Sequence, residues 1–528
     1  MSETDKAPDP TVPKRRVWPF VVVALVAAGV TAGLAVLISN MGDRKNEGNA
    51  STYNRVVELN DTTYDPAVWG KNYPKQYDMY LQTAQITPNA HVKAWAPATE
   101  ASRTTTLASD PTGPPVFFPD TRAEVTPSKL VEDPRLKTLW AGYAFSKDYR
   151  HLRGHEWMLT DQEDTLRVLA LRDSEKAQPG ACANCHTSLP QTLDELGNGD
   201  QAAGWETMNK TPYTDLMDSG AFHGPIACID CHDPATMQLR ITRPALIEGL
   251  KQLKASQGIA DYDVNKDATN QEMRSYVCAQ CHVEYYFKPP NKTLTFPWAS
   301  SGATSNADGL DINNAWQYYQ DVQITAADGT TSTGFTDFVN AQSGAKVLKA
   351  QHPEFETWSQ GVHAQNGVTC ADCHMNYVRD GAQKVSNHHV ASPMADPNAS
   401  CGVCHPGSTA NLQARVTTIQ TRFVDSRNRT LDATVALIGD IKAATDNGAD
   451  PNLIALAQQY QNFANFYVDY AYSENSYGFH APDYSQRILL QSLDAARNGQ
   501  LVLLGVPADQ LVPIDGLNKF ATAPATEG

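Results

Sequence analysis

The sequence predicts a mainly α-helical protein that begins with one hydrophobic helix, and three observations support this prediction. Beyond residue 410, apolar side chains recur at intervals of three and four, as in Val416, Ile419 and Phe423, which places them on one helix face. Residues 17–38 contain no charge, and the run is as long as the roughly 20 residues that cross a bilayer. Alternating patterns that would predict strands are scarce.

The N-terminal apolar run predicts where the chain lies. Three cationic residues at 14–16 precede it, and such a flank normally stays in the cytoplasm. We therefore expect a cytoplasmic N-terminus at 1–16, a transmembrane anchor at 17–38 and a polar linker at 39–50, with the rest of the chain outside the cytoplasm. A cleaved signal peptide is the alternative, although its apolar region would normally be shorter, roughly 7–15 residues, and end in an A-x-A-like site.

Residues 51–410 are expected to form one domain that carries the chemistry. Within it, 51–135 is rich in proline, threonine and aspartate, which predicts loops and short helices. The pair Thr160-Asp161 indicates the start of a helix, with Arg167 about two turns further along. The Gly/Ser/Thr/Asp-rich segment 300–334 predicts a surface loop.

The C-terminal region, 411–528, predicts long helices that complete this domain. Asp450 followed by Pro451 is a favourable helix start. A third helix is expected from Pro482 to Gly499, where the glycine would end it. The second helix carries aromatic side chains on one face, and from the pattern alone this face either packs in the core or forms a homodimer interface.

All ten cysteines fall in Cys-x-x-Cys pairs, and a histidine follows each of the five pairs. With 14 histidines in 528 residues, five such followers would occur by chance with a probability of roughly one in 10⁸. This motif attaches haem c, because its thiols bond to the haem vinyl groups and its histidine binds the iron. Disulfides, zinc sites and iron–sulfur clusters also use cysteine pairs, but none requires a histidine after every pair. The sequence therefore predicts a multihaem cytochrome c fold with five covalent haems.

The attachment cysteines and proximal iron ligands form five sets: Cys182, Cys185 and His186; Cys228, Cys231 and His232; Cys278, Cys281 and His282; Cys370, Cys373 and His374; and Cys401, Cys404 and His405. The other nine histidines are candidates for the second ligand: His91, His151, His155, His223, His352, His363, His388, His389 and His480. Five of them could cap every iron, as in an electron-transfer cytochrome, or four could leave one iron open, as in an enzyme. The formal net charge of −16 argues against a nucleic-acid partner.

Four stretches, in this order, carry a family resemblance: AFSKDYRHLRGHEWMLTD (144–161), CAQCHVEYYF (278–287), LKAQHPEFETW (348–358) and GFHAP (478–482). From about Leu139 to Arg487 the chain resembles the ammonia-forming pentahaem cytochrome c nitrite reductases. The resemblance implies six-electron reduction of nitrite to ammonium at one open haem iron, fed through four haems with two histidine ligands each. The alternatives are a pentahaem electron-transfer cytochrome without an open iron, or a related reductase of hydroxylamine or sulfite.

The resemblance also assigns the distal ligands. Four histidines match the family's positions, each opposite a motif histidine: His155 with His282, His388 with His232, His363 with His405, and His480 with His374. His388 is chosen over the adjacent His389 by its distance in sequence from Pro393. The haem of the first motif then keeps an open iron and is the expected active site. The best-known members carry lysine at the position of His186, although a histidine variant exists in the family.

For catalysis the resemblance implies Arg167, Tyr285 and His352. Arg167 would hold the nitrite anion with its fixed charge and paired donors. His352 would supply protons near neutral pH, and Tyr285 would add a hydrogen bond. From the residues alone, Arg167 could instead pair with a haem propionate, Tyr285 could pack on a haem face, and His352 could bind another iron.

A calcium site is also implied, because Glu284, Tyr285, Lys349 and Gln351 match the family's ligand positions, with Tyr285 and Lys349 contributing backbone oxygens. Some members with histidine on the active haem replace calcium by a basic side chain. Among partners, the resemblance implies a homodimer and a membrane-bound quinol-oxidising multihaem cytochrome as electron donor. The expected place of action is the extracytoplasmic, periplasmic face of the cytoplasmic membrane.

Overall fold

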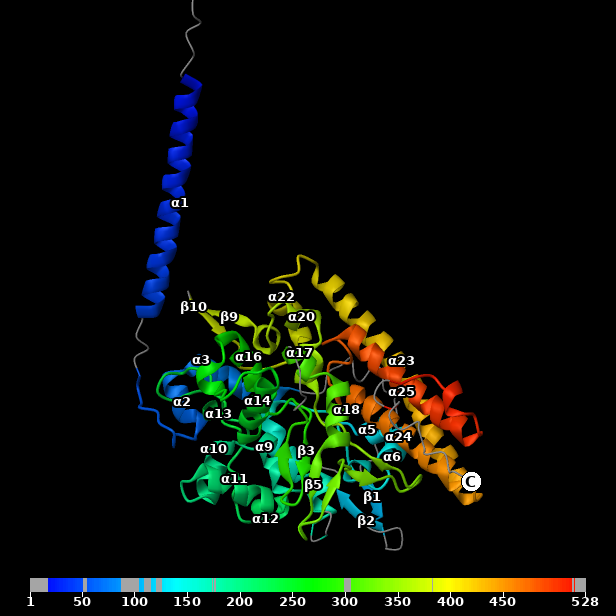
Figure 1. Ribbon diagram of the computed structural model, residues 1–528. Helices are drawn as coiled ribbons and strands as arrows, with labels where there is room; N and C mark the ends of the chain where they lie inside the picture. Colours follow the sequence, from blue (N-terminus) through cyan, green and yellow to red (C-terminus); the bar gives the residue numbers. More distant parts are fainter. Residues whose placement is uncertain are drawn as a thin grey trace, which may run out of the picture. The chain divides into compact units, whose positions relative to one another are not determined.

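The computed structural model describes residues 18–50, 55–86, 104–108, 115–119, 126–172, 174, 177–298, 305–381, 383–514 and 517. The chain divides into two compact units (Figure 1). One contains Met1–Val56 and Gly381–Gln383, and the other contains Val57–Asp380 and Lys384–Gly528. The candidate ligand His91 lies outside the described residues.

The first unit contains helix α1, Trp18–Ala50. Its window Val21–Met41 has a mean hydropathy of 2.7, and among the described residues it alone is long and apolar enough to span a membrane. The helix continues through 42–50, where the sequence predicts a linker. That stretch contains arginine, lysine and glutamate, which favour helices, and no proline, and the helix continues through its glycines, Gly42 and Gly48.

Short helices make up most of the second unit before residue 409. They are α2 (Pro66–Asn72), α3 (Pro74–Leu81), α5 (Lys129–Glu132), α6 (Arg135–Leu139), α7 (Met158–Glu163), α8 (Leu166–Leu169), α9 (Ala183–His186), α10 (Leu189–Leu196), α11 (Gln201–Lys210), α12 (Tyr213–Asp218), α13 (Cys228–Cys231), α14 (Pro244–Ser256), α15 (Val264–Asp267), α16 (Asn270–Ala279), α17 (Asn306–Gly309), α18 (Ile312–Asp321), α19 (Glu354–Ser359), α20 (Val362–Gln365), α21 (Cys370–His374) and α22 (Pro397–Ser400). Single 3₁₀ turns join them: η1 (Gln82–Gln85), η2 (Ala144–Ser146), η3 (His155–Trp157), η4 (Gly180–Cys182), η5 (Pro393–Ala395) and, near the C-terminus, η6 (Ala508–Gln510).

Strands are short, and in the described part of the chain they form only two-stranded sheets. The pairs are β1 (Thr104–Ala108) with β2 (Pro115–Pro119), β3 (Tyr286–Lys288) with β4 (Thr293–Thr295), β5 (Gln323–Thr325) with β6 (Thr331–Thr333), β7 (Phe338–Val339) with β8 (Lys346–Val347), and β9 (Tyr377–Asp380) with β10 (Gln383–Ser386). The mainly α fold predicted from the sequence is therefore confirmed.

Three long helices end the second unit: α23 (Thr409–Asp446), α24 (Pro451–Ser473) and α25 (Pro482–Leu503). They lie side by side in the yellow to red part of Figure 1. The Asp450 side chain caps α24 by accepting from the Asn452 N–H at 2.9 Å, as its helix-start pattern predicts. On the aromatic face of α24, Phe463, Tyr467 and Tyr470 are at most 1 % exposed and Tyr460 is 8 % exposed. This face is core of its own chain, which settles the alternative left open by the pattern.

Helix α25 runs past Gly499, where the sequence predicts its end. A Cβ at Gly499 would lie 2.8 Å from two Leu437 side-chain carbons and 3.2 Å from the Tyr460 Cβ. The glycine therefore permits the close approach of α25 to α23 and α24, and it does not end the helix.

The described part of the segment 300–334, residues 305–334, also contains more regular structure than its composition predicts. Helix α18 buries Ile312, Ala315, Trp316 and Tyr319, which recur at the spacing of one helix face. The aromatic residues in this otherwise polar stretch were the signal for a helix, because Trp316 and Tyr319 pack against Phe466 of α24.

Candidate haem ligands and active site

Each of the first four motifs lies on or next to a short helix, α9, α13, α16 or α21, so its cysteines and histidine project from one turn of backbone. All ten cysteines are described, and none forms a disulfide. This arrangement leaves both thiols of every motif available for thioether bonds.

Four pairs of imidazoles face one another in the second unit. Their ring centres are 6.4 Å apart in His155–His282, 6.2 Å in His232–His388, 6.2 Å in His363–His405 and 6.3 Å in His374–His480. A metal ion bound at about 2 Å to one nitrogen of each ring would hold the ring centres roughly 6 Å apart. Each pair therefore fits one iron between its rings.

These pairs are the ones that the family resemblance implies. His388, not its neighbour His389, is the residue that faces His232. Within the described part of the chain, His186 of the first motif faces no second imidazole. Two other candidates lie against acids: His151 Nε2 is 2.5 Å from Glu132 and His223 Nε2 is 2.6 Å from Glu195.

Backbone carbonyls orient three of the paired rings, and also His186, through Nδ1. The contacts are His186 to Met158 O at 2.9 Å, His232 to Met237 O at 3.0 Å, His374 to Ala391 O at 3.1 Å and His388 to Ser386 O at 2.9 Å. A ring that donates from Nδ1 keeps Nε2 free as a metal ligand. The donor set thus suits haem iron in chemistry as well as spacing.

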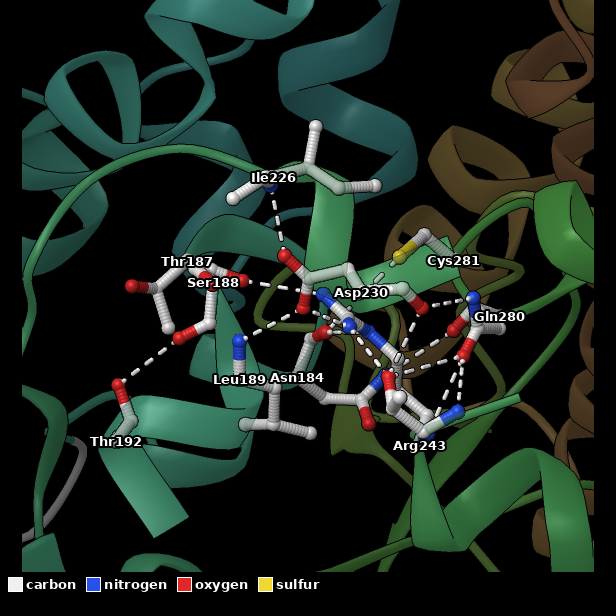
Figure 2. Close-up of polar contacts among 12 residues, drawn as sticks. Asn184, Thr187, Ser188, Leu189, Thr192, Ile226, Asp230, Arg243, Gln280 and Cys281 are labelled. Atoms are coloured by element: carbon white, nitrogen blue, oxygen red, sulfur yellow. Dashed lines mark hydrogen bonds and ion pairs between the residues drawn. The ribbon is translucent and has the colours of Figure 1, made fainter. Parts of the chain in front are cut away.

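A buried ion pair fastens the first three motifs to one another (Figure 2). Arg243 and Asp230 are both fully buried and joined through Nη1 and Oδ1. Arg243 also donates to the carbonyls of Asn184 and Thr187, both at 3.1 Å. Asn184 in turn donates to the Gln280 carbonyl at 3.1 Å. Since Asn184, Asp230 and Gln280 each precede the second cysteine of a motif, residues that the motif leaves variable set the positions of three haems.

Arg167 lies on α8, separate from the helix predicted at Thr160. Helix α7 ends at Glu163, because the Asp148 carboxylate accepts from the Thr165 hydroxyl at 2.9 Å and the Leu166 N–H at 3.0 Å and so starts a new turn. The Arg167 guanidinium donates to the Asp148 carbonyl at 3.2 Å and lies 4.3 Å above the Phe145 ring. These contacts fix its direction but leave most of its donors available to an anion.

The positive charge of Arg167 changes the pKa values of Tyr285 and of His186 in the first motif. Burial raises the pKa of Tyr285 well above its ordinary value, the Cys185 and Cys182 thiols add to this, and Arg167 opposes it. Burial also lowers the pKa of His186, to about 4, and Arg167 lowers it further. Arg167 and Tyr285 therefore lie together beside the motif that contains His186.

His352 is neutral in this environment. Burial is the main cause that lowers its pKa to about 3, with Glu354 acting against it and His282, Lys349 and His186 acting in the same direction. The sequence predicts a proton donor that titrates near neutral pH, whereas burial favours the neutral imidazole. At neutral pH His352 is instead a donor through the single N–H of a neutral imidazole.

The predicted calcium ligands lie together around Glu284, which is fully buried. Its carboxylate accepts from the Gln351 N–H at 2.7 Å and the Tyr319 hydroxyl at 3.0 Å, and the Gln351 amide lies 3.3 Å from the Lys349 carbonyl. Burial raises the pKa of Glu284 well above its ordinary value. An oxygen-rich site around one buried carboxylate suits Ca²⁺, which would supply the missing positive charge.

The Lys349 ammonium does not supply the positive charge beside Glu284, because it is bound to other groups. It pairs with Asp469 at 3.1 Å and donates to the Ser473 hydroxyl at 3.1 Å, and both members of the pair are 1 % exposed. The same ammonium lies 4.8 Å from the centre of the Phe145 ring, and Phe145 also contacts the Arg167 guanidinium. The calcium ligands and the Arg167 side chain are thus connected through Phe145.

Comparison with known proteins gives consistent matches over almost the whole chain. The family cytochrome c552 matches residues 65–518. A cytochrome c-552 of Bacteroides fragilis is 34 % identical over 503 residues, which cover 94 % of this chain and 88 % of the relative. The cytochrome c nitrite reductase subunit NrfA of Nitratidesulfovibrio vulgaris is 33 % identical over 494 residues, which cover 90 % and 84 %.

One solved structure is similar over the same extent. It is the catalytic subunit NrfA of the cytochrome c nitrite reductase from Desulfovibrio desulfuricans, in which two calcium sites are described. Its TM-score is 0.67 and its sequence identity 26 %, with 89 % of this chain and 90 % of that chain covered.

Proposed function

Because this chain belongs to the cytochrome c552 family, it is a multihaem cytochrome c nitrite reductase, and we propose that it reduces nitrite to ammonium at the haem of its first motif. One observation carries this assignment. Four motif histidines face a second imidazole, whereas His186 faces none among the described residues. The paired histidines would then be the ligands of four electron-transfer haems.

A haem held by Cys182, Cys185 and His186 would supply the iron that binds nitrite and the electrons that reduce it. The protein's own part is to hold an anion and deliver protons. Arg167, fixed by Asp148 and Phe145, directs its remaining N–H donors toward the nitrite oxygens and stabilises the charge that develops there. Tyr285 stays protonated well above neutral pH, so its hydroxyl donates as well.

His352 donates a hydrogen bond from the N–H of its neutral imidazole, and the protons that the reaction consumes come from solvent. Bound calcium would be held by Glu284, by Gln351 and by the Tyr285 and Lys349 carbonyls. Tyr285 is itself one of these ligand residues, and His352 directly follows Gln351, so the cation would fix the backbone at both catalytic residues. The cation would thus position two of the three catalytic side chains.

We also propose a membrane anchor, an electron donor and a homodimer for this enzyme. Helix α1 anchors the chain in the cytoplasmic membrane, with the haem unit on the extracytoplasmic side and a membrane-bound quinol-oxidising multihaem cytochrome as electron donor. The chain forms a homodimer through the outward faces of α23 and α25. On α25, Leu490 and Leu501 are 59 % and 38 % exposed, and Leu504 directly after it is 81 % exposed, which favours a protein partner.

The function is tested by the yield of ammonium per nitrite consumed, measured on the purified protein with an excess of reduced viologen dye. We expect a yield near one, together with one high-spin haem in the oxidised protein. No consumption of nitrite, with every haem reducible and low-spin, would identify an electron-transfer cytochrome instead. Nitrite loss without ammonium would mean that His186 gives this iron a different chemistry.

Substitution of His352 by alanine separates its proposed role from that of an iron ligand. We expect kcat for nitrite to fall about 10²-fold, the lower range for loss of a proton donor, because water can partly replace the N–H. The number of high-spin haems should not change. His223→Ala, which removes an exposed histidine bound to Glu195, is the control and should leave turnover unaffected. A second high-spin haem in His352→Ala would show that His352 binds an iron.

A further inference from the structure

Two of the paired histidines differ from the others in what their Nδ1 atoms contact. His480 Nδ1 lies 2.7 Å from the Glu474 carboxylate, which is 3 % exposed. His282 Nδ1 lies 3.7 Å from the Glu354 carboxylate, within ion-pair distance but beyond a hydrogen bond. The contacts of His186, His232, His374 and His388 are all neutral backbone carbonyls.

The Glu474 carboxylate is held rigidly in place. It accepts from the Ser476 N–H at 3.1 Å and from the Ser476 hydroxyl at 2.7 Å, and that hydroxyl accepts from the His480 N–H at 2.9 Å. Gly478 closes this loop with a positive φ of 79°, and a Cβ there would lie 2.7 Å from the Phe423 ring. The loop therefore has one conformation, which aims the carboxylate at His480.

The same segment also orients the second carboxylate. Asn475, which follows Glu474, donates to Glu354 from its backbone N–H at 3.3 Å and its side-chain amide at 2.5 Å. Residues 474–476 thus fix a strong contact at His480 and a weaker one at His282.

A carboxylate that accepts a proton from a ligating imidazole makes that imidazole a stronger electron donor. A stronger donor stabilises the oxidised, more positive iron and so lowers its reduction potential. Backbone carbonyls have the same geometry without the negative charge, so the effect should be strongest at His480, weaker at His282 and smallest at His186.

We propose that Glu474 is a positioning residue that lowers the reduction potential of the haem between His374 and His480. The electron donation from the ligating imidazole to the iron would then be strongest at His480, weaker at His282 and weakest at His186. The order matches the spatial sequence of the motifs. The Cys370 N–H donates to the Ser275 hydroxyl of α16 at 3.4 Å, and the Cys281 thiol lies 3.9 Å from the Asn184 carbonyl, so the third motif contacts both the fourth motif and the first. This inference rests on the proposed ligand assignment.

The test is Glu474→Gln in the full chain with all five haems, followed by spectroelectrochemical titration of the low-spin haems. Glutamine keeps an acceptor for His480 and removes the charge. We expect the reduction equilibrium of one low-spin haem to shift about tenfold toward the reduced form, which is 59 mV for one electron. Ser476→Ala, which removes one of the hydrogen bonds that hold Glu474, should shift the same haem in the same direction by less.

Glu132→Gln is the matched control, because Glu132 contacts His151, which faces no other imidazole among the described residues. Its five potentials should equal those of the unchanged chain. Unchanged potentials in Glu474→Gln, or equal shifts in the control, would overturn the inference. Failure of the ligand assignment has a separate signature, since His480→Ala would then produce no additional high-spin haem.

Discussion

Alanine in place of Arg167 is expected to lower kcat for nitrite about 10³-fold, with all five haems still attached. The guanidinium is placed to donate to developing negative charge, and loss of one such donor typically reduces kcat by about 10²–10³. A fixed charge is lost in addition, which favours the upper end of that range. The measurement is steady-state nitrite reduction with a reduced dye, normalised to haem content from the pyridine haemochrome spectrum.

Arg172→Ala provides the control for this substitution. Arg172 lies close in sequence, and its side chain is 32 % exposed and paired with Asp218 at the surface. An exposed pair of this kind contributes about 0–1 kcal/mol, so both turnover and haem content should be unchanged. If Arg167→Ala retained full turnover, Arg167 would belong among the partners of a haem propionate and the anion would be held by other residues.

Alanine in place of Arg243 is expected to destabilise the haem unit by about 3–5 kcal/mol, because it leaves the buried Asp230 carboxylate without its partner. It also removes the hydrogen bonds to the Asn184 and Thr187 carbonyls. The thermal midpoint of the haem-loaded protein, followed by far-ultraviolet circular dichroism, should fall by several degrees, since 1 kcal/mol corresponds to about 2–4 °C in a domain of 150–250 residues.

Arg274→Ala is the comparison that isolates burial. Arg274 contacts Asp372, which precedes the second cysteine of the fourth motif, at 2.6 Å, but this pair is 15 % and 36 % exposed. We expect a loss of at most about 1 kcal/mol there. Equal midpoints for the two variants would mean that the Arg243–Asp230 pair is no more important than a surface contact.

The sequence was a good guide to residues whose chemistry is local. The five motifs identify the haem attachment residues without help from the fold, because the cysteines and histidine lie within five positions. The start of α24 follows from Asp450 and Pro451 in the same way. The four histidine pairs needed more, since His155 and His282 lie far apart in the chain, and only the family pattern connected them.

The predictions that failed depend on contacts between distant segments. The break before Arg167 comes from Asp148, a residue in another loop. Gly499 permits helix packing against Leu437, a contact that no local pattern reveals. Likewise, nothing in the sequence marks Glu474 as the partner of His480, because a glutamate near a histidine is common and only the loop geometry aims one at the other.

The junction of Asn184, Asp230 and Gln280 has a consequence for how such chains evolve. Attachment requires only the two cysteines and the histidine, so duplication or exchange of a motif would preserve the number of haems. It would not preserve their arrangement, because a valine such as Val403 in the fifth motif has no side-chain carboxylate that could pair with Arg243 as Asp230 does. In the first three motifs, the position that haem attachment leaves free to vary is therefore the one that joins the motifs, and divergence at that position is constrained by assembly and not by haem chemistry.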